Sequence, residues 1–120
     1  RASLRGINAR IIYALIDGDL AGFAVYRDDR NINPNAIQRS ILLGIAVSPY
    51  HRGRGVGRLL LRGVEFFLTL QDQDVHLHVM YEKDMDGVDL PSLGYKKDTL
   101  GNYEKVLKPA TVDKFSDTSF

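Results

Sequence analysis

A glycine- and arginine-rich segment joins a strongly apolar stretch of the chain to an amphipathic one. Its sequence is Arg52-Gly53-Arg54-Gly55-Val56-Gly57-Arg58, and we call it the glycine loop. Glycine lacks a Cβ and adopts positive φ angles, so successive backbone N–H groups can converge on one anion. A helix that begins directly after the loop adds unpaired N–H groups and about half a positive charge. With its arginines, the loop therefore predicts a site for a phosphate or pyrophosphate group.

The spacing of the glycines excludes the two best-known phosphate-binding motifs. No Gly-Lys-Ser or Gly-Lys-Thr follows, as a Walker A loop requires, and the third glycine of the dinucleotide fingerprint is replaced by Arg58. Two other interpretations stay open: a plain connector between a strand and a helix, and an Arg-Gly patch that binds RNA. Such RNA-binding patches are disordered, whereas the glycine loop runs directly into a hydrophobic segment.

A second group of charged residues follows the predicted strand at 75–80. It consists of Glu82, Asp84, Asp86 and Asp89, opposed only by Lys83. Most charge runs of this kind are solvated loops. The functional interpretation is an acidic rim that attracts a cationic partner to a nearby site. Both interpretations stay open from the residues alone.

Hydrophobic periodicity predicts the elements that hold the glycine loop. The apolar run 40–47 before the loop is typical of a strand covered on both faces. Residues 56–70, which begin within the glycine loop, have the period of a helix, with one polar stripe toward solvent. That stripe consists of Arg58, Arg62, Glu65 and Thr69. Because the helix separates 40–47 from the next strand, 75–80, the two strands should be parallel and joined by a right-handed crossover.

Further strands are expected on both sides of this crossover. Residues 10–16 are apolar on both faces and predict a central strand, which the tight turn 17–19 joins to a partner strand at 20–27. A second hairpin is expected over 95–98 and 103–108. The predicted fold class is therefore α+β: a mixed sheet with a central strand–glycine loop–helix–strand crossover and flanking hairpins.

Composition bounds the remaining possibilities. The chain has 120 residues, and 16 Lys plus Arg against 15 Asp plus Glu leave a net charge of +1, which disfavours direct nucleic-acid binding. It has no Cys, so a disulfide scaffold and a cysteine nucleophile are excluded. The longest apolar run, 41–47, is too short for a membrane span. We expect one domain over 1–108, a polar loop over 27–39 and a C-terminal tail over 109–120.

The glycine loop also resembles a known signature. Arg52-Gly53-Arg54-Gly55-Val56-Gly57 fits the Arg/Gln-x-x-Gly-x-Gly/Ala motif of the GNAT N-acetyltransferases. The match extends upstream through Ile45-Ala46-Val47-Ser48-Pro49 and downstream through Leu59-Leu60. Leu93-Gly94-Tyr95 is similar to the Leu-Gly-Phe that opens the sixth strand of that family. The resemblance covers roughly residues 9–108.

The resemblance implies a cofactor and a way of binding it. The cofactor would be acetyl-CoA, with its pyrophosphate on residues 52–58. The pantetheine arm would pair with the backbone of Ile45, Ala46 and Val47 like an additional strand. Two departures from the family pattern stand out. The first strand and two helices of the family have no counterpart here, so a partner chain or a separate segment would complete the fold. The tyrosine that protonates the departing thiolate falls on Leu90, which Pro91 follows.

The same resemblance implies catalytic candidates. Acetyl transfer needs a base for the amine, and His76 and His78 share one face of the strand beside the cofactor strand. Their other interpretation is a pair of structural histidines, and without a third ligand they make no metal site. Tyr81 is the substitute for the missing acid, with a packing aromatic as its other interpretation.

The expected function is acetyl transfer from acetyl-CoA to a primary amine, with a lysine of a protein or histone-like peptide as the acceptor. The acidic residues Glu82, Asp84, Asp86 and Asp89 would attract that basic acceptor. Acetylation of a polyamine or another small amine is the next possibility. A rival of another class is a degenerate module that binds CoA but serves structure or regulation. The expected setting is intracellular, without a membrane.

Overall fold

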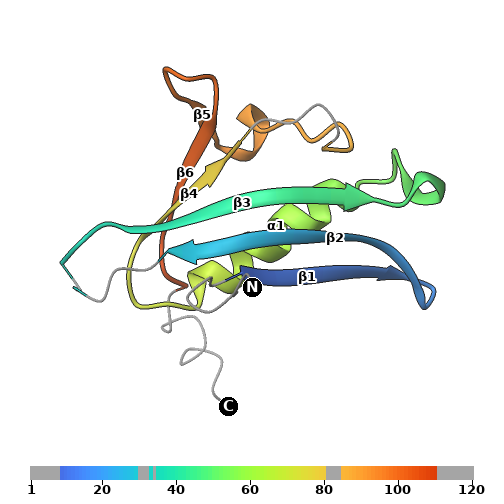
Figure 1. Cartoon of the computed structure of the whole chain (residues 1–120), viewed down its shortest axis with the longest axis horizontal. Coiled ribbons are helices and arrows are strands. Elements are labelled where there is room, and N and C mark those ends of the chain that lie inside the picture. The colour runs from blue at the N-terminus through green and yellow to red at the C-terminus, as the bar shows by residue number, and fades with distance from the viewer. Residues whose placement is uncertain (1–8, 30–32, 34, 81–84, 111–120) are drawn as a thin grey trace, which may run out of the picture.

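The computed structural model describes residues 9–29, 33, 35–80 and 85–110 of the chain. In these ranges the strands form a sheet, and the helix α1 lies behind that sheet in Figure 1. In chain order they are β1 (Ala9–Ile16), β2 (Asp19–Asp29), β3 (Gln38–Val47), α1 (Val56–Thr69), β4 (Val75–Val79), β5 (Lys96–Lys97) and β6 (Tyr103–Leu107). The strands form one six-stranded sheet in the order β1-β2-β3-β4-β6-β5. The expected α+β class and its mixed sheet are therefore confirmed.

The first hairpin forms where the sequence predicts it, but its first strand lies elsewhere in the sheet. Asp17 and Gly18 have φ angles of 51° and 84°, which is the twist that a two-residue hairpin requires. The prediction of a central strand at 10–16 is wrong, because β1 is an edge strand. Its outward side chains Ile11, Tyr13 and Leu15 are 53%, 62% and 65% exposed. Apolar residues on both faces therefore indicate an open sheet face here, and not a covered strand.

The long loop expected over 27–39 is shorter than predicted at both ends. β2 continues to Asp29 and β3 begins at Gln38, and the register pairs Asp28 with Ser40 and Asp29 with Arg39. Ladder hydrogen bonds between the strands outweigh the low strand propensity of these polar residues. The cover expected on both faces of 40–47 is also incomplete, because Leu43 is exposed on the face away from α1.

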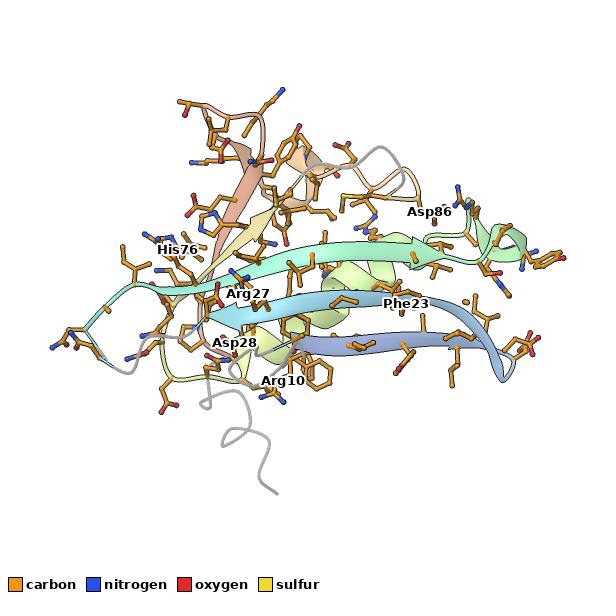
Figure 2. All side chains as sticks on the ribbon, in the orientation of Figure 1. Arg10, Phe23, Arg27, Asp28, His76 and Asp86 are labelled. Atoms are coloured by element: carbon orange, nitrogen blue, oxygen red, sulfur yellow. The ribbon has the colours of Figure 1, made fainter. Side chains whose placement is uncertain are left out.

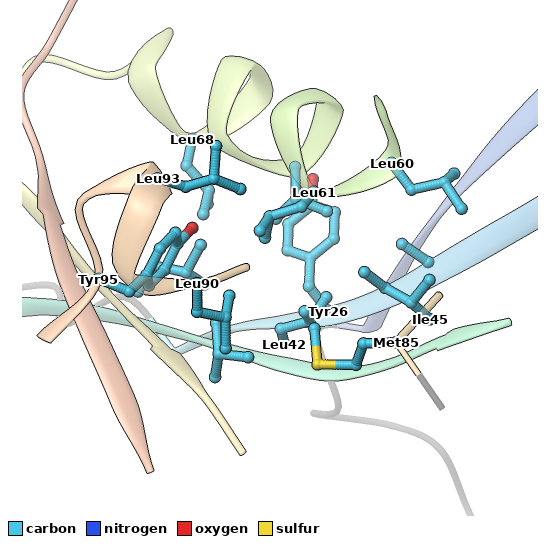
Figure 3. Close-up of a cluster of buried hydrophobic side chains, with 14 of the residues drawn as sticks. Tyr26, Leu42, Ile45, Leu60, Leu61, Leu68, Met85, Leu90, Leu93 and Tyr95 are labelled. Atoms are coloured by element: carbon cyan, nitrogen blue, oxygen red, sulfur yellow. The ribbon is translucent and has the colours of Figure 1, made fainter. Parts of the chain in front are cut away.

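The parallel pairing of the two strands that the helix connects is confirmed. β3 and β4 pair in parallel, and α1 connects them across one face of the sheet. α1 places Leu60, Leu61, Val64 and Leu68 in the main hydrophobic cluster of the described residues. Figure 3 shows the helix lying over Tyr26 and Leu42 of the sheet. This packing fixes the N-terminus of α1, and with it the glycine loop.

The polar stripe predicted for α1 is only partly correct. Glu65 is buried, with 8% of its surface exposed, whereas the apolar Phe66 and Phe67 face outward. Their rings contact each other edge to face, with centroids 5.6 Å apart. No helix in the described ranges is long and apolar enough to cross a membrane.

Candidate functional site

The glycine loop follows β3, as predicted, and its last three residues, Val56, Gly57 and Arg58, form the first turn of α1. After β3 ends, a short 3-10 helix at Pro49–His51 turns the chain toward α1. Gly53 and Gly55 then have φ angles of 76° and 82°, which other residues adopt only with strain. A Cβ at either position would meet no atom within 4 Å. These two glycines are therefore required by the backbone conformation and not by lack of space.

Backbone N–H groups of the loop converge on one negative charge. The N–H of Gly53 donates to Oδ1 of Asp86 over 3.0 Å, and the N–H of Gly57 donates to Oδ2 of the same carboxylate over 3.4 Å. The N-cap residue of α1 is Gly55, which has no side chain to make a capping hydrogen bond, so the Asp86 carboxylate takes that place at the N-terminus of the helix. Figure 2 shows Asp86 beside the segment that follows β3. The loop thus has the donors and the geometry that a phosphate group needs.

The three arginines of the glycine loop are exposed. Within the described part of the chain, Arg52, Arg54 and Arg58 make no hydrogen bond or ion pair. A hollow of about 260 Å³ adjoins the loop, and Arg58, Asp86 and Asp89 contribute to its lining. Positive side chains are therefore available where a bound anion would lie.

Among the described residues, the strand before the loop has one backbone edge without a strand partner on the side of β4. The parallel ladder between β3 and β4 ends at the pair Leu42–Val79, although β3 continues to Val47. Over Ile45, Ala46 and Val47, the strand pairing recorded for the described part of the chain is with β2. Figure 1 shows β3 and β4 diverging beyond this point. An extended ligand could pair with this edge as an added strand does.

The two candidate histidines occupy different surroundings on one face of β4. His76 lies 2.8 Å from Glu104 of β6, measured from Nδ1 to Oε1. His78 is half-buried and, among the described residues, has no hydrogen bond. It pairs with Ile41, one position before the end of the parallel ladder. His78 is therefore the histidine nearer to the point where the strands diverge.

The structure describes only part of the acidic segment. Tyr81, Glu82 and Asp84 lie outside the described residues. Asp89 is exposed, as an acidic rim requires, whereas Asp86 binds the glycine loop. The Asp86–Gly87 pair has φ angles of 53° and 68°, the turn conformation that an Asp-Gly dipeptide favours. That dipeptide could have predicted a tight turn, but not the position of its carboxylate.

A buried polar cluster holds the following segment against α1. The Tyr95 hydroxyl donates to Oε2 of Glu65 over 2.6 Å, and the Lys105 ammonium donates to the same oxygen over 3.1 Å. Tyr95 belongs to the hydrophobic core, since it is 3% exposed. Burial, and then the hydrogen bond to Glu65, raises the pKa of Tyr95 well above its usual value. The contact joins α1 to the chain segment that carries Asp86.

We expect Tyr95→Phe to lower the free energy of unfolding by about 1.5–3 kcal/mol at pH 7, the net worth of a hydrogen bond to a charged group. The raised pKa adds a pH dependence. The hydroxyl ionises near pH 10 in the unfolded chain but not in the folded one. Its contribution is therefore complete below pH 10 and falls as the pH rises further. Urea denaturation at pH 7 and pH 10.5 measures both effects.

Tyr13→Phe is the matched control, because Tyr13 is exposed on β1. Its stability should equal that of the unmodified protein at pH 7. The Tyr95→Phe variant should also lose less stability between pH 7 and pH 10.5 than the unmodified protein does. Equal alkaline losses in the two proteins would show that Tyr95 is not the group responsible.

Comparisons with known proteins agree with this geometry. The model of the acetyltransferase (GNAT) family matches residues 3–95. A ribosomal-protein-alanine N-acetyltransferase from Escherichia coli has a TM-score of 0.58 at 20% identity, covering 89% of this chain and 74% of its own. The corresponding enzyme from Brucella melitensis has a TM-score of 0.55 at 21% identity, covering 64% of this chain and 53% of its own.

A third similar solved structure contains coenzyme A. PaiA N-acetyltransferase from Thermoplasma acidophilum, in complex with coenzyme A, has a TM-score of 0.57 at 17% identity. The match covers 84% of this chain and 61% of that one. Identities at this level show a shared fold. No curated protein sequence matches the chain.

The matches cover different shares of the compared proteins. The chain spans about half the length of the Brucella enzyme, 53%, and three quarters of the Escherichia coli one, 74%. The family model, in contrast, includes the glycine loop, both strands of the parallel pair and the helix between them. The chain belongs to the GNAT family of acetyltransferases.

Proposed function

We propose that this chain binds acetyl-CoA through the glycine loop and transfers the acetyl group to a primary amine. The observation that carries the proposal is the convergence of the Gly53 and Gly57 N–H groups on one carboxylate at the N-terminus of α1. Two backbone donors that already hold an anion match the phosphate chemistry of CoA. Membership of the GNAT family supports the same cofactor and the same class of reaction.

The two parts of the cofactor would bind to the two parts of the site. The pyrophosphate would accept hydrogen bonds from residues 52–58, and the exposed Arg52, Arg54 and Arg58 would balance its charge. The pantetheine arm would lie along the free edge of β3 at Ile45, Ala46 and Val47, where β4 has diverged. The thioester would then reach the gap between β3 and β4.

The chemistry at that gap requires proton transfer. Acetyl-CoA supplies an acetyl group that is already activated as a thioester. An ordinary lysine amine has a pKa of about 10.4 and must lose a proton before it attacks the carbonyl carbon. His78, directly or through one water, is the described residue best placed to take that proton. Tyr81 is proposed as the donor that returns a proton to the departing sulfur.

The proposed acceptor is a lysine of a basic protein or peptide. The support is the acidic character of the segment after β4, of which Asp89 is exposed beside the glycine loop. Glu82 and Asp84 are included in the proposal as residues that raise the local concentration of a cation, whereas the carboxylate of Asp86 is bound by the glycine loop. A polyamine has the same charge on a smaller molecule and is the competing acceptor.

A transfer assay against a panel of amines tests the function. Release of free thiol from acetyl-CoA would be measured with a lysine-rich peptide, an acidic peptide that contains one lysine, and spermidine. We expect the fastest turnover with the lysine-rich peptide and a rate that falls as salt is added, since ions screen exposed charges over about 8 Å. CoA binding without turnover of any amine would instead favour the non-catalytic module.

We expect His78→Ala to lower kcat on the order of 100-fold, which is typical for loss of a general base, while KM for acetyl-CoA stays unchanged. The reason is that His78 takes part in proton transfer and not in cofactor binding. The pH–rate profile of the variant should lose its acidic limb. Steady-state kinetics between pH 5.5 and pH 9 measure both quantities.

His76→Ala is the comparison variant, because His76 is on the same face of β4 but contacts Glu104. We expect it to keep the acidic limb of the profile. If His76→Ala loses that limb and His78→Ala does not, the two roles are exchanged. If both variants keep it, neither histidine is the base.

A further inference from the structure

We propose that Asp86 is an internal competitor for the phosphate site: its carboxylate occupies the glycine loop and must leave before the diphosphate of CoA binds. The inference rests on the proposed function, because it concerns the same loop. The inference adds that a side chain of the protein itself, Asp86, lowers the affinity for the cofactor. On this proposal, Asp86 is bound by the glycine loop and is not simply a solvated surface residue of the acidic segment.

The carboxylate occupies the donors that a phosphate would use. Both of its oxygens accept backbone hydrogen bonds, Oδ1 from Gly53 and Oδ2 from Gly57. Each of these N–H groups has one proton, so it cannot serve the carboxylate and a phosphate oxygen at full strength together. Two negative groups at this spacing also repel each other. Occupation by Asp86 and by a diphosphate therefore exclude each other.

Two further contacts hold the Asp86 segment against β3 and the start of α1, and a hydrogen bond within the segment closes its turn. Met85 is 6% exposed and belongs to the same hydrophobic cluster as Ile45 of β3, as Figure 3 shows. The Asp86 segment also lies close against the start of α1. A Cβ added to Gly57 would lie 2.9 Å from the Met85 carbonyl oxygen and 3.0 Å from the Val88 side chain. The N–H of Val88 donates to the Met85 carbonyl over 3.1 Å, closing the turn.

The same geometry shows why a diphosphate can displace Asp86. The carboxylate satisfies two backbone donors of the loop, whereas Arg52, Arg54 and Arg58 have no partner among the described residues. A diphosphate has more charge and more acceptor atoms than a carboxylate, so it can engage the backbone and the arginines together. The hollow of about 260 Å³ that Arg58 and Asp86 line lies beside the contact and leaves room for the exchange.

Removal of the carboxylate should therefore strengthen anion binding. Asp86→Asn keeps the size of the side chain and removes its charge, and Asp86→Gly removes the side chain altogether. Both residue types tolerate the φ of 53° at this position, so neither variant adds backbone strain. Asp72→Asn is the matched control: it makes the same charge change at an exposed residue beyond the other end of α1.

Isothermal titration calorimetry with CoA and with inorganic pyrophosphate tests the inference. We expect the dissociation constants of both ligands to fall by roughly three- to tenfold in Asp86→Asn and Asp86→Gly. Asp72→Asn should bind as the unmodified protein does. Thermal unfolding of each variant without ligand checks that the comparison is made between folded proteins.

The other outcomes separate this inference from the proposed function. Unchanged affinities in both Asp86 variants, with CoA still bound, overturn the competition and leave cofactor binding intact. Weaker binding in both variants also overturns it, because Asp86 would then help to form the site. An equal gain in Asp72→Asn assigns the effect to overall charge and overturns it too. Absence of CoA binding in every protein overturns the inference together with the proposed function.

Discussion

The Gly55→Glu variant is expected to fold and to lose detectable binding of CoA. Gly55 directly precedes α1 with a φ angle of 82°, and its Cβ position is open. A glutamate there adds backbone strain of about 1–2 kcal/mol, which a folded domain can tolerate. Its carboxylate enters the region in which a phosphate would bind and repels the negatively charged ligand there. Calorimetry with CoA, together with thermal unfolding, measures both effects.

Gly18→Glu is the matched control for that variant. Gly18 has a φ angle of 84° and equally open surroundings, but it lies in the turn between β1 and β2. The two variants should lose similar stability, whereas only Gly55→Glu should lose CoA. Gly57 is a poor site for this test, because a Cβ there would lie 2.9 Å from the Met85 carbonyl oxygen. Normal CoA binding by a folded Gly55→Glu protein would contradict the proposed site.

The second large effect is expected in α1 itself. Leu61→Ala should lower the free energy of unfolding by about 2–5 kcal/mol, since truncation of a fully buried leucine leaves a cavity. Leu61 is 0% exposed and belongs to the cluster that joins the helix to Tyr26 and Leu42. A domain of this size is stable by only about 5–15 kcal/mol, so this loss is a large share of the total. Urea denaturation measures the stability change.

Leu59→Ala provides the control on the same helix. Leu59 is 59% exposed, so the identical truncation should change stability by no more than about 0.5 kcal/mol. The difference between the two leucines reports burial against the sheet, because helix propensity is the same for both changes. Equal losses in the two variants would mean that α1 does not pack on the sheet through Leu61.

The elements around the site could be predicted from the sequence because local signals determine them. The Asp17-Gly18 turn specifies the first hairpin, and the helical period after residue 55 specifies α1. The glycine loop was predicted on the same basis, since positive φ angles at Gly53 and Gly55 are a property of the residue type. The parallel pairing of β3 and β4 followed from the helix that separates them.

Features that depend on contacts distant in sequence could not be predicted in the same way. Glu65 looks like a solvent residue at helical spacing, and only the approach of Tyr95 and Lys105 makes its burial favourable. The edge position of β1 depends on strand order, which alternation of side chains does not encode. The contact of Asp86 with Gly53 joins residues 33 positions apart, so charge spacing within the acidic segment could not reveal it.

The site as a whole is therefore better defined on its cofactor side than on its acceptor side. Backbone geometry supports the glycine loop and the free edge of β3, whereas Tyr81, Glu82 and Asp84 stay predictions. His78 is proposed as the general base because of its position next to the end of the parallel ladder. The proposed acceptor rests on charge, and the panel of amines tests it.

The most direct test of the central claim is a titration of the ¹⁵N-labelled protein with CoA, followed by NMR of the backbone amides. The glycine loop donates N–H groups to the phosphates in the proposed complex, so the largest shifts should occur at Gly53, Gly55 and Gly57. Smaller shifts should follow along β3 at Ile45 and Val47, with little change at the turn between β1 and β2. Saturable binding that leaves the three glycine amides unchanged would contradict the claim.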